Sequence, residues 1–180
     1  GPHASRPQAM GFCFLNNVAI AARHAMEFHG LARVAIVDFD VHHGNGTEDV
    51  FAGDERVLMC SIFQHPFFPN SGTEQPAANM VNVPVAAYTA GAAVRTIVTD
   101  TWLPRLEAHR PELILISAGF DAHREDDMGQ MGLVEADYAW ITEQLVDVAE
   151  RHCQGRIVST LEGGYNLSAL GPSVEAHIRG

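Results

Sequence analysis

A run of carboxylates and histidines, Asp38-Phe39-Asp40-Val41-His42-His43-Gly44-Asn45-Gly46, follows the apolar stretch 34–37. Such an apolar stretch is typical of a buried β-strand. Asp38, Asp40 and His42 are two residues apart, so their side chains project from one face of an extended chain. Carboxylates that are buried without a partner are costly, and a bound cation removes that cost. The spacing therefore predicts a metal site where a strand runs into a loop.

A further carboxylate, Asp121, comes just after a second apolar run at 113–118. A single Asp in this position is more often a helix cap or a turn residue. Together with Asp40 and His42, however, it gives three ligands and leaves one position open. This is the arrangement of a catalytic zinc site that holds a water molecule. The same oxygen-rich set would also accept ferrous iron.

The segment Glu162-Gly163-Gly164-Tyr165-Asn166 follows a third apolar run at 156–161. By itself it indicates a turn between a strand and a helix, with the Tyr as a packing residue. Next to a metal site, the same loop can present a phenol that donates to a carbonyl oxygen as charge develops there. Phe12 and the Phe67-Phe68-Pro69 run are ordinary packing residues by type, and together they can form the wall of an apolar channel.

Apolar stretches alternate with amphipathic ones along the chain. The pattern predicts strands at 33–39, 57–62, 80–84, 113–118 and 156–161, and helices at 16–28, 47–51, 92–109, 135–152 and from 167 onward. This alternation indicates βαβ units and a mainly parallel sheet with helices on both faces. We therefore expect an α/β fold with three layers, α/β/α, in one domain over residues 1–180. Ligands bind beyond the carboxyl ends of the strands in such folds, where the candidate residues lie.

The bulk composition excludes several classes of protein. The chain of 180 residues is 47% apolar, which favours a folded domain. Its net charge of −11 disfavours nucleic acid or an anionic membrane as a partner. It has no apolar run of membrane-spanning length and no secretory signal pattern. Cys13, Cys60 and Cys153 are scattered and odd in number, so we expect a reducing compartment, the cytoplasm.

Six segments give the chain a resemblance to the histone deacetylase superfamily. This superfamily includes class II-like histone deacetylases, bacterial deacetylase-like amidohydrolases and acetylpolyamine amidohydrolases. The segments are Gly-Pro-His-Ala (1–4), Met-Gly-Phe-Cys-Phe-Leu-Asn-Asn (10–17), Val-Asp-Phe-Asp-Val-His-His-Gly-Asn-Gly-Thr (37–47), Phe-Phe-Pro-Asn-Ser-Gly (67–72), Ser-Ala-Gly-Phe-Asp-Ala (117–122) and Leu-Glu-Gly-Gly-Tyr-Asn-Leu (161–167). The Asp-x-Asp-x-His-His-Gly pattern is highly specific, and the resemblance implies the arginase/deacetylase-like version of the α/β/α fold.

The resemblance also implies a reaction, the hydrolysis of an N-acetyl amide on a primary amine. The substrate is then an acetylated lysine peptide or an acetylated polyamine. Asp40, His42 and Asp121 match the family's zinc ligands. Tyr165 matches the tyrosine that polarises the substrate carbonyl.

Further roles follow from the same resemblance. His3 matches the second histidine of the family's tandem pair, which is the general base, and Asn45 matches the group that orients it. Asp38 matches the partner of the first histidine of that pair and a contributor to a structural potassium site. The implied potassium site comprises Asp38, Asp40, His42, Ser61 and Ile62. The implied substrate channel comprises Gly11, Phe12, Phe68 and Met128.

The chain departs from the family pattern near its first residue. The family has two adjacent histidines where this chain has Pro2-His3, so Asp38 loses the usual partner. The chain has no initiator Met and lacks the family's long N-terminal region, so we expect an N-terminally truncated domain with an apolar sheet edge uncovered. A short loop, 73–80, replaces a longer Gly-rich connection.

Two alternatives to a deacetylase stay open. One is a catalytically impaired fragment or pseudoenzyme that binds an acyl-lysine or a metal without turnover, which Pro2 favours. The other is a binuclear, arginase-like hydrolase, which would need a second set of Asp and His ligands. The oligomeric state is left open by the sequence.

Overall fold

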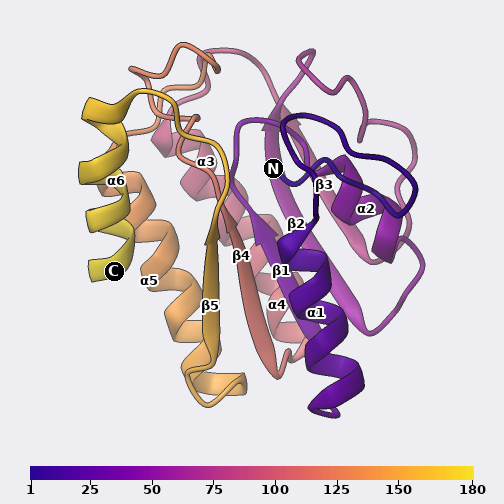
Figure 1. Cartoon of the computed structure of the whole chain (residues 1–180). Coiled ribbons are helices and arrows are strands. Elements are labelled where there is room, and N and C mark those ends of the chain that lie inside the picture. The colour runs from indigo at the N-terminus through magenta and orange to yellow at the C-terminus, as the bar shows by residue number, and fades with distance from the viewer.

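A parallel sheet of five strands forms the centre of the molecule (Figure 1). The computed structural model describes residues 1–180. The strands lie in the order β3-β2-β1-β4-β5, and every neighbouring pair is parallel. Their bounds are β1 Val34–Asp38, β2 Val57–Gln64, β3 Met80–Val85, β4 Leu113–Ala118 and β5 Ile157–Leu161.

Helices cover both faces of this sheet, as Figure 1 shows. Their bounds are α1 Asn17–Phe28, α2 Asn45–Phe51, α3 Gly91–Ile97, α4 Leu103–His109, α5 Glu135–His152 and α6 Leu167–Arg179. α1 and α2 pack on one face, α3, α4 and α5 pack on the other, and α6 lies beside α5. None of the helices is long and apolar enough to cross a membrane. The predicted three-layer α/β/α fold is thus confirmed.

Each face of the sheet has its own apolar core. Successive residues of a strand point to opposite faces. Ile36 of β1 therefore belongs to a cluster of 12 buried residues under α1 and α2. Its neighbour Val37 belongs to a cluster of 26 under α3, α4 and α5. Burial on both faces explains why β1 is a continuous apolar run rather than an alternating one.

The order of the strands creates the place for a site. From β1 the chain proceeds outward through β2 to β3, and then returns to the other side of β1 to form β4 and β5. The loops that follow β1 and β4 therefore diverge from neighbouring strands, which opens a crevice at the carboxyl ends. The register places Asp38 beside both Ser61 and Ser117 at this end.

The stretch predicted as one helix at 92–109 is helical throughout, but it is not one α-helix. Residues Val98–Trp102 form a π-helical segment between α3 and α4, in which the N–H of Leu103 bonds to the carbonyl of Val98. Pro104 gives the physical reason. Proline has no N–H, and its ring clashes with the carbonyl four residues earlier in a regular α-helix. The wider π turn relieves this clash.

β5 forms an edge of the sheet, and its outer side has no neighbouring strand. Two of its apolar side chains are exposed, Val158 to 52% and Leu161 to 58%. β5 is therefore an edge strand with exposed apolar side chains. Exposed apolar edge strands favour pairing with other chains.

Candidate active site

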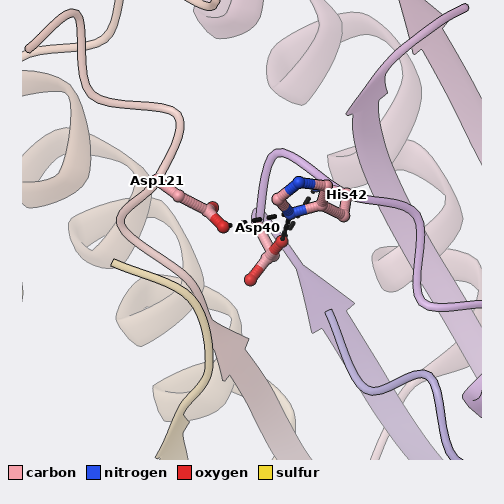
Figure 2. Close-up of side chains that lie close together, drawn as sticks. All are labelled: Asp40, His42 and Asp121. Atoms are coloured by element: carbon pink, nitrogen blue, oxygen red, sulfur yellow. Dashed lines mark hydrogen bonds and ion pairs between the residues drawn. The ribbon is translucent and has the colours of Figure 1, made fainter. Parts of the chain in front are cut away.

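The loops after β1 and β4 bring three possible metal ligands together (Figure 2). The Nδ1 atom of His42 lies 3.1 Å from Oδ1 of Asp40 and 3.1 Å from Oδ2 of Asp121. The ligand atoms of the three side chains all lie within 4.8 Å of one another, and all three residues are buried. Two carboxylate oxygens and one imidazole nitrogen suit Zn²⁺ or Fe²⁺.

The cluster attracts positive charge. Burial alone would lower the pKa of His42, but hydrogen bonds to Asp121 and Asp40 outweigh burial and raise this pKa to about 9. Burial, reinforced by the charge of Asp40, raises the pKa of Asp121. Two buried carboxylates that stabilise a protonated imidazole in this way fit a divalent metal.

Backbone N–H groups hold the two carboxylates in place. The N–H of Gly163 donates to Oδ2 of Asp40 at 2.8 Å, and the N–H of Val41 donates to Oδ1 of Asp121 at 2.9 Å. Glycine is required where the backbone approaches this closely. A Cβ atom on Gly163 would lie 2.0 Å from Asp121, and one on Gly119 would lie 2.2 Å from Asp40. The Gly-rich loops after β4 and β5 therefore support the ligands directly.

The predicted base and its orienting residue are in contact. His3 is buried, and its Nδ1 atom lies 2.7 Å from Oδ1 of Asn45 at the start of α2. Burial lowers the pKa of His3. His3 is therefore neutral at pH 7. Its ring lies 6.1 Å from the ring of His42, measured between centroids.

The residues predicted for a substrate channel line one cavity of about 480 Å³ beside the metal cluster. Two phenylalanine rings of this lining pack against the rings of His3 and His42. Phe68 meets His3 edge-on at 5.1 Å, and Phe67 stacks on His42 at 5.3 Å. The lining of the cavity includes all four residues predicted for the channel, Gly11, Phe12, Phe68 and Met128. It also includes His3, Phe67 and Tyr165.

Tyr165 lies at the same cavity on the loop after β5. The residue is 46% exposed. Partial burial, followed by the negative charges of Asp121 and Asp40, raises the pKa of Tyr165 to about 12. The phenol therefore keeps its proton at neutral pH and can donate a hydrogen bond.

The residues of the implied potassium site lie at the end of β1, in the loop after it, and within β2. Asp38 and Ser61 are paired in the register, and Ile62 follows Ser61 on β2. Oδ1 of Asp38 accepts from the N–H of Asp40 at 3.0 Å, whereas Oδ2 is buried without a hydrogen-bond partner. Burial raises the pKa of Asp38.

Three residues of this region were not predicted as site residues. Burial raises the pKa of Glu162 to about 7, and the charges of Asp40 and Asp121 add to this effect. Nε2 of His43 lies 2.5 Å from the Glu48 carboxylate. The position of His43 directly after the predicted ligand His42 could have drawn attention to it. Asp126 accepts three backbone N–H groups, described below.

Comparisons with known proteins agree with this arrangement. Residues 1–180 match the histone deacetylase domain family. Histone deacetylase 14, chloroplastic, from Arabidopsis thaliana is 39% identical over 185 residues, which cover 99% of this chain and 44% of that protein. The histone deacetylase-like amidohydrolase of Pseudomonas aeruginosa is 38% identical over 173 residues, which cover 92% of this chain and 46% of that protein.

A solved structure shares the fold. The crystal structure of the HDA15 HD domain matches with a TM-score of 0.91 and 37% sequence identity, over 98% of this chain and 52% of that chain. This chain therefore spans about half or less of the length of these relatives. The family match extends over every residue, and the relatives are deacetylases and deacetylase-like amidohydrolases. The chain belongs to the histone deacetylase family.

Proposed function

We propose that residues 1–180 form a single, partial catalytic domain that hydrolyses N-acetyl amides with the help of Zn²⁺. The observation that carries this proposal is the position of the Asp40–His42–Asp121 cluster beside a cavity with aromatic walls. Ferrous iron is the alternative metal for the same ligand set. Zn²⁺ held there would supply a Lewis acid for the acetyl carbonyl and would lower the pKa of the attacking water.

His3 is the general base of the proposed reaction. The amide oxygen of Asn45 can only accept a hydrogen bond, so His3 carries its proton on Nδ1 and keeps a lone pair on Nε2. A neutral imidazole in this tautomer can remove a proton from water. Asn45 acts by fixing the tautomer and the orientation of the ring.

Tyr165 stabilises the charge that develops on the acetyl oxygen. A phenol that keeps its proton can donate a hydrogen bond to this oxygen in the transition state. The side chain of Tyr165 lines the same cavity as His3, so both groups can act on one bound acetyl group.

The cavity favours a long, apolar stem that ends in an acetyl group. Phe12, Phe68 and Met128 supply apolar walls, and the metal cluster lies beside them. An acetylated lysine side chain and an acetylated polyamine both have such a stem. Either is a substrate in this proposal. The structural potassium ion would lie near Asp38, with Asp40, His42, Ser61 and Ile62 around it.

A reducing compartment, the cytoplasm, is part of the same proposal. Cys13, Cys60 and Cys153 are all free, and the latter two are buried. Burial raises the pKa of Cys60 to about 12 and of Cys153 to about 11, so neither is a reactive thiolate.

A second candidate function is a binding module without turnover. It is favoured by Pro2, which cannot carry a proton, and by the unpartnered Oδ2 atom of Asp38. A binuclear hydrolase has less support, because the structure has one group of three or more possible ligands, Asp40, His42 and Asp121.

The test is hydrolysis of an acetyl-lysine reporter with added Zn²⁺, with and without a chelator. We expect turnover that the chelator abolishes. We expect Asp121→Ala to abolish it too, and Tyr165→Phe to lower it by about 100- to 1,000-fold. Asp147→Ala, which removes an exposed carboxylate from α5, is the control and keeps full activity. Full activity in Asp121→Ala would contradict the ligand assignment, and stoichiometric Zn²⁺ binding without turnover would favour the binding module.

A further inference from the structure

Asp126 joins two loops of the candidate site through backbone N–H groups. Its side chain is buried, with 5% of the residue exposed. Oδ2 accepts from the N–H of Tyr165 at 2.7 Å and from the N–H of Asn166 at 3.0 Å. Oδ1 accepts from the N–H of Met128 at 2.9 Å. Each carboxylate oxygen thus binds a different loop.

The loop that carries Tyr165 depends on this carboxylate for its position. At its start, the N–H of Gly163 is fixed to the metal ligand Asp40. Gly164 follows with φ of +142°, a conformation that favours glycine. Tyr165 is 46% exposed, so packing covers only part of the residue. Its backbone N–H is fixed by the hydrogen bond to Asp126.

A second contact strengthens the same connection. The side-chain amide of Asn166 donates to the carbonyl of Glu125 at 2.7 Å. Oδ1 of Asn166 also accepts from the N–H of Ala169 and caps α6. The loop after β5, the start of α6 and the turn around Asp126 therefore form one hydrogen-bonded unit.

We propose that Asp126 is a positioning residue for the reaction, which holds the Tyr165 hydroxyl over the substrate carbonyl and couples it to Met128 at the wall of the channel. This inference rests on the proposed function. A carboxylate is suited to the role because it offers only acceptors, and three N–H donors converge on it. An amide in its place would turn an NH₂ group toward one of these donors.

The first test compares Asp126→Asn with Glu125→Gln. Both remove one negative charge from the same turn, but the side chain of Glu125 is exposed. We expect Asp126→Asn to lower kcat by about 10- to 100-fold, the usual cost of misplacing a catalytic group by about 1 Å. KM for the acetyl-lysine reporter and the affinity for Zn²⁺ stay close to those of the parent protein, and Glu125→Gln leaves all three unchanged.

A double mutant separates positioning from general damage. If Asp126 acts through the phenol, Asp126→Asn has little further effect on kcat in a Tyr165→Phe background. If Asp126 only stabilises the fold, the two losses multiply. Equal fold-losses in the two backgrounds would overturn the proposal. Asp126→Ser is the second variant if Asp126→Asn does not fold, since its smaller side chain leaves room for water to accept the three N–H groups.

Amide hydrogen exchange tests the contact without any reference to activity. We expect the amides of Tyr165, Asn166 and Met128 to exchange faster in Asp126→Asn, while the amide of Val41, bonded to Asp121, keeps its protection. Unchanged exchange at all three positions would overturn the proposal. Faster exchange in a protein that shows no chelator-sensitive deacetylation would instead count against the proposed function, with the link between the loops still supported.

Discussion

The Nδ1 atom of His3 lies 2.7 Å from the Oδ1 atom of Asn45, and His3 lines the same cavity as His42. The contact joins the N-terminal segment to Asn45, the first residue of α2. One side chain of the motif therefore orients a residue that is 42 positions away in the sequence. An amide is a neutral acceptor, so it fixes the tautomer of His3 without adding a charge that would favour the protonated ring.

Replacing this neutral acceptor with a charged one tests its role. We expect Asn45→Asp to raise the pKa of His3, because a carboxylate stabilises the protonated imidazole. The acid limb of the kcat/KM profile should then move upward by about 1 pH unit or more. Gln154→Glu adds the same charge beyond α5 and should leave the profile unchanged. An unshifted acid limb in Asn45→Asp would show that another group is the base.

Asp121 is predicted to determine metal affinity. Asp121→Asn keeps an oxygen for the N–H of Val41, so it removes mainly the ligand charge. Loss of an outer-shell partner alone weakens metal binding by about 10- to 100-fold, and we expect loss of a direct ligand to cost at least about 100-fold. Competition for Zn²⁺ against a chelator measures this, with Asp147→Asn as the control. Undiminished Zn²⁺ affinity would remove Asp121 from the ligand set.

Tyr165→Phe removes a hydroxyl and little else. We expect kcat to fall by about 100- to 1,000-fold, the cost of losing one donor to a developing oxyanion. KM and the unfolding midpoint in urea should change little, since the ring remains and is 46% exposed. Tyr88→Phe, at a more exposed tyrosine, serves as the control. A rise in KM with unchanged kcat would mean that Tyr165 binds the substrate but does not stabilise the transition state.

The grouping of Asp40, His42 and Asp121 could be predicted from sequence because these residues follow apolar strands. In a parallel sheet the carboxyl ends of the strands meet at one edge, so Asp40, His42 and Asp121 had to approach one another. The strands could also be located from sequence, because burial on both faces of the sheet leaves unbroken apolar runs such as β1.

The residues that support the cluster could not be predicted in this way. Asp126 has the same residue type as its neighbour Asp127, and only its three backbone donors distinguish it. Glu162 acquires its raised pKa from burial next to other carboxylates, which is a tertiary effect. The π-helical turn before Pro104 was not predicted. The spacing of apolar residues gives no information about the backbone N–H that proline lacks.

The burial of His177 leads us to expect that the folded protein is less stable in mild acid. It is buried, with Nδ1 2.6 Å from the hydroxyl of Thr142 and Nε2 2.7 Å from the hydroxyl of Ser159. Burial lowers the pKa of His177 below its usual 6.5. Above pH 6.5 the ring is neutral in both states and the full stability is present. As the pH falls below 6.5, the unfolded chain takes up a proton that the folded protein resists, so the free energy of unfolding decreases.

Urea unfolding at pH 7.5 and pH 5.5 measures this effect. We expect a lower free energy of unfolding at the lower pH, and a smaller decrease in His177→Gln, which cannot take up the proton. His24→Gln is the matched control, because His24 is exposed on α1. If the decrease in His177→Gln equals that of the parent protein, other groups cause the acid sensitivity.

Pro2→His is predicted to increase turnover. Oδ2 of Asp38 is buried without a partner, and the family resemblance implies that a histidine at position 2 would pair with it. A paired imidazole can hold a proton near the reacting water, so we expect kcat to rise by at least about 10-fold, within the range of general acid–base catalysis. Pro7→His, at an exposed position of the same segment, should have no effect. Equal kcat values in Pro2→His, Pro7→His and the parent protein would show that Pro2 does not limit turnover. No detectable turnover in any of the three would favour a module that binds acetylated ligands without hydrolysing them.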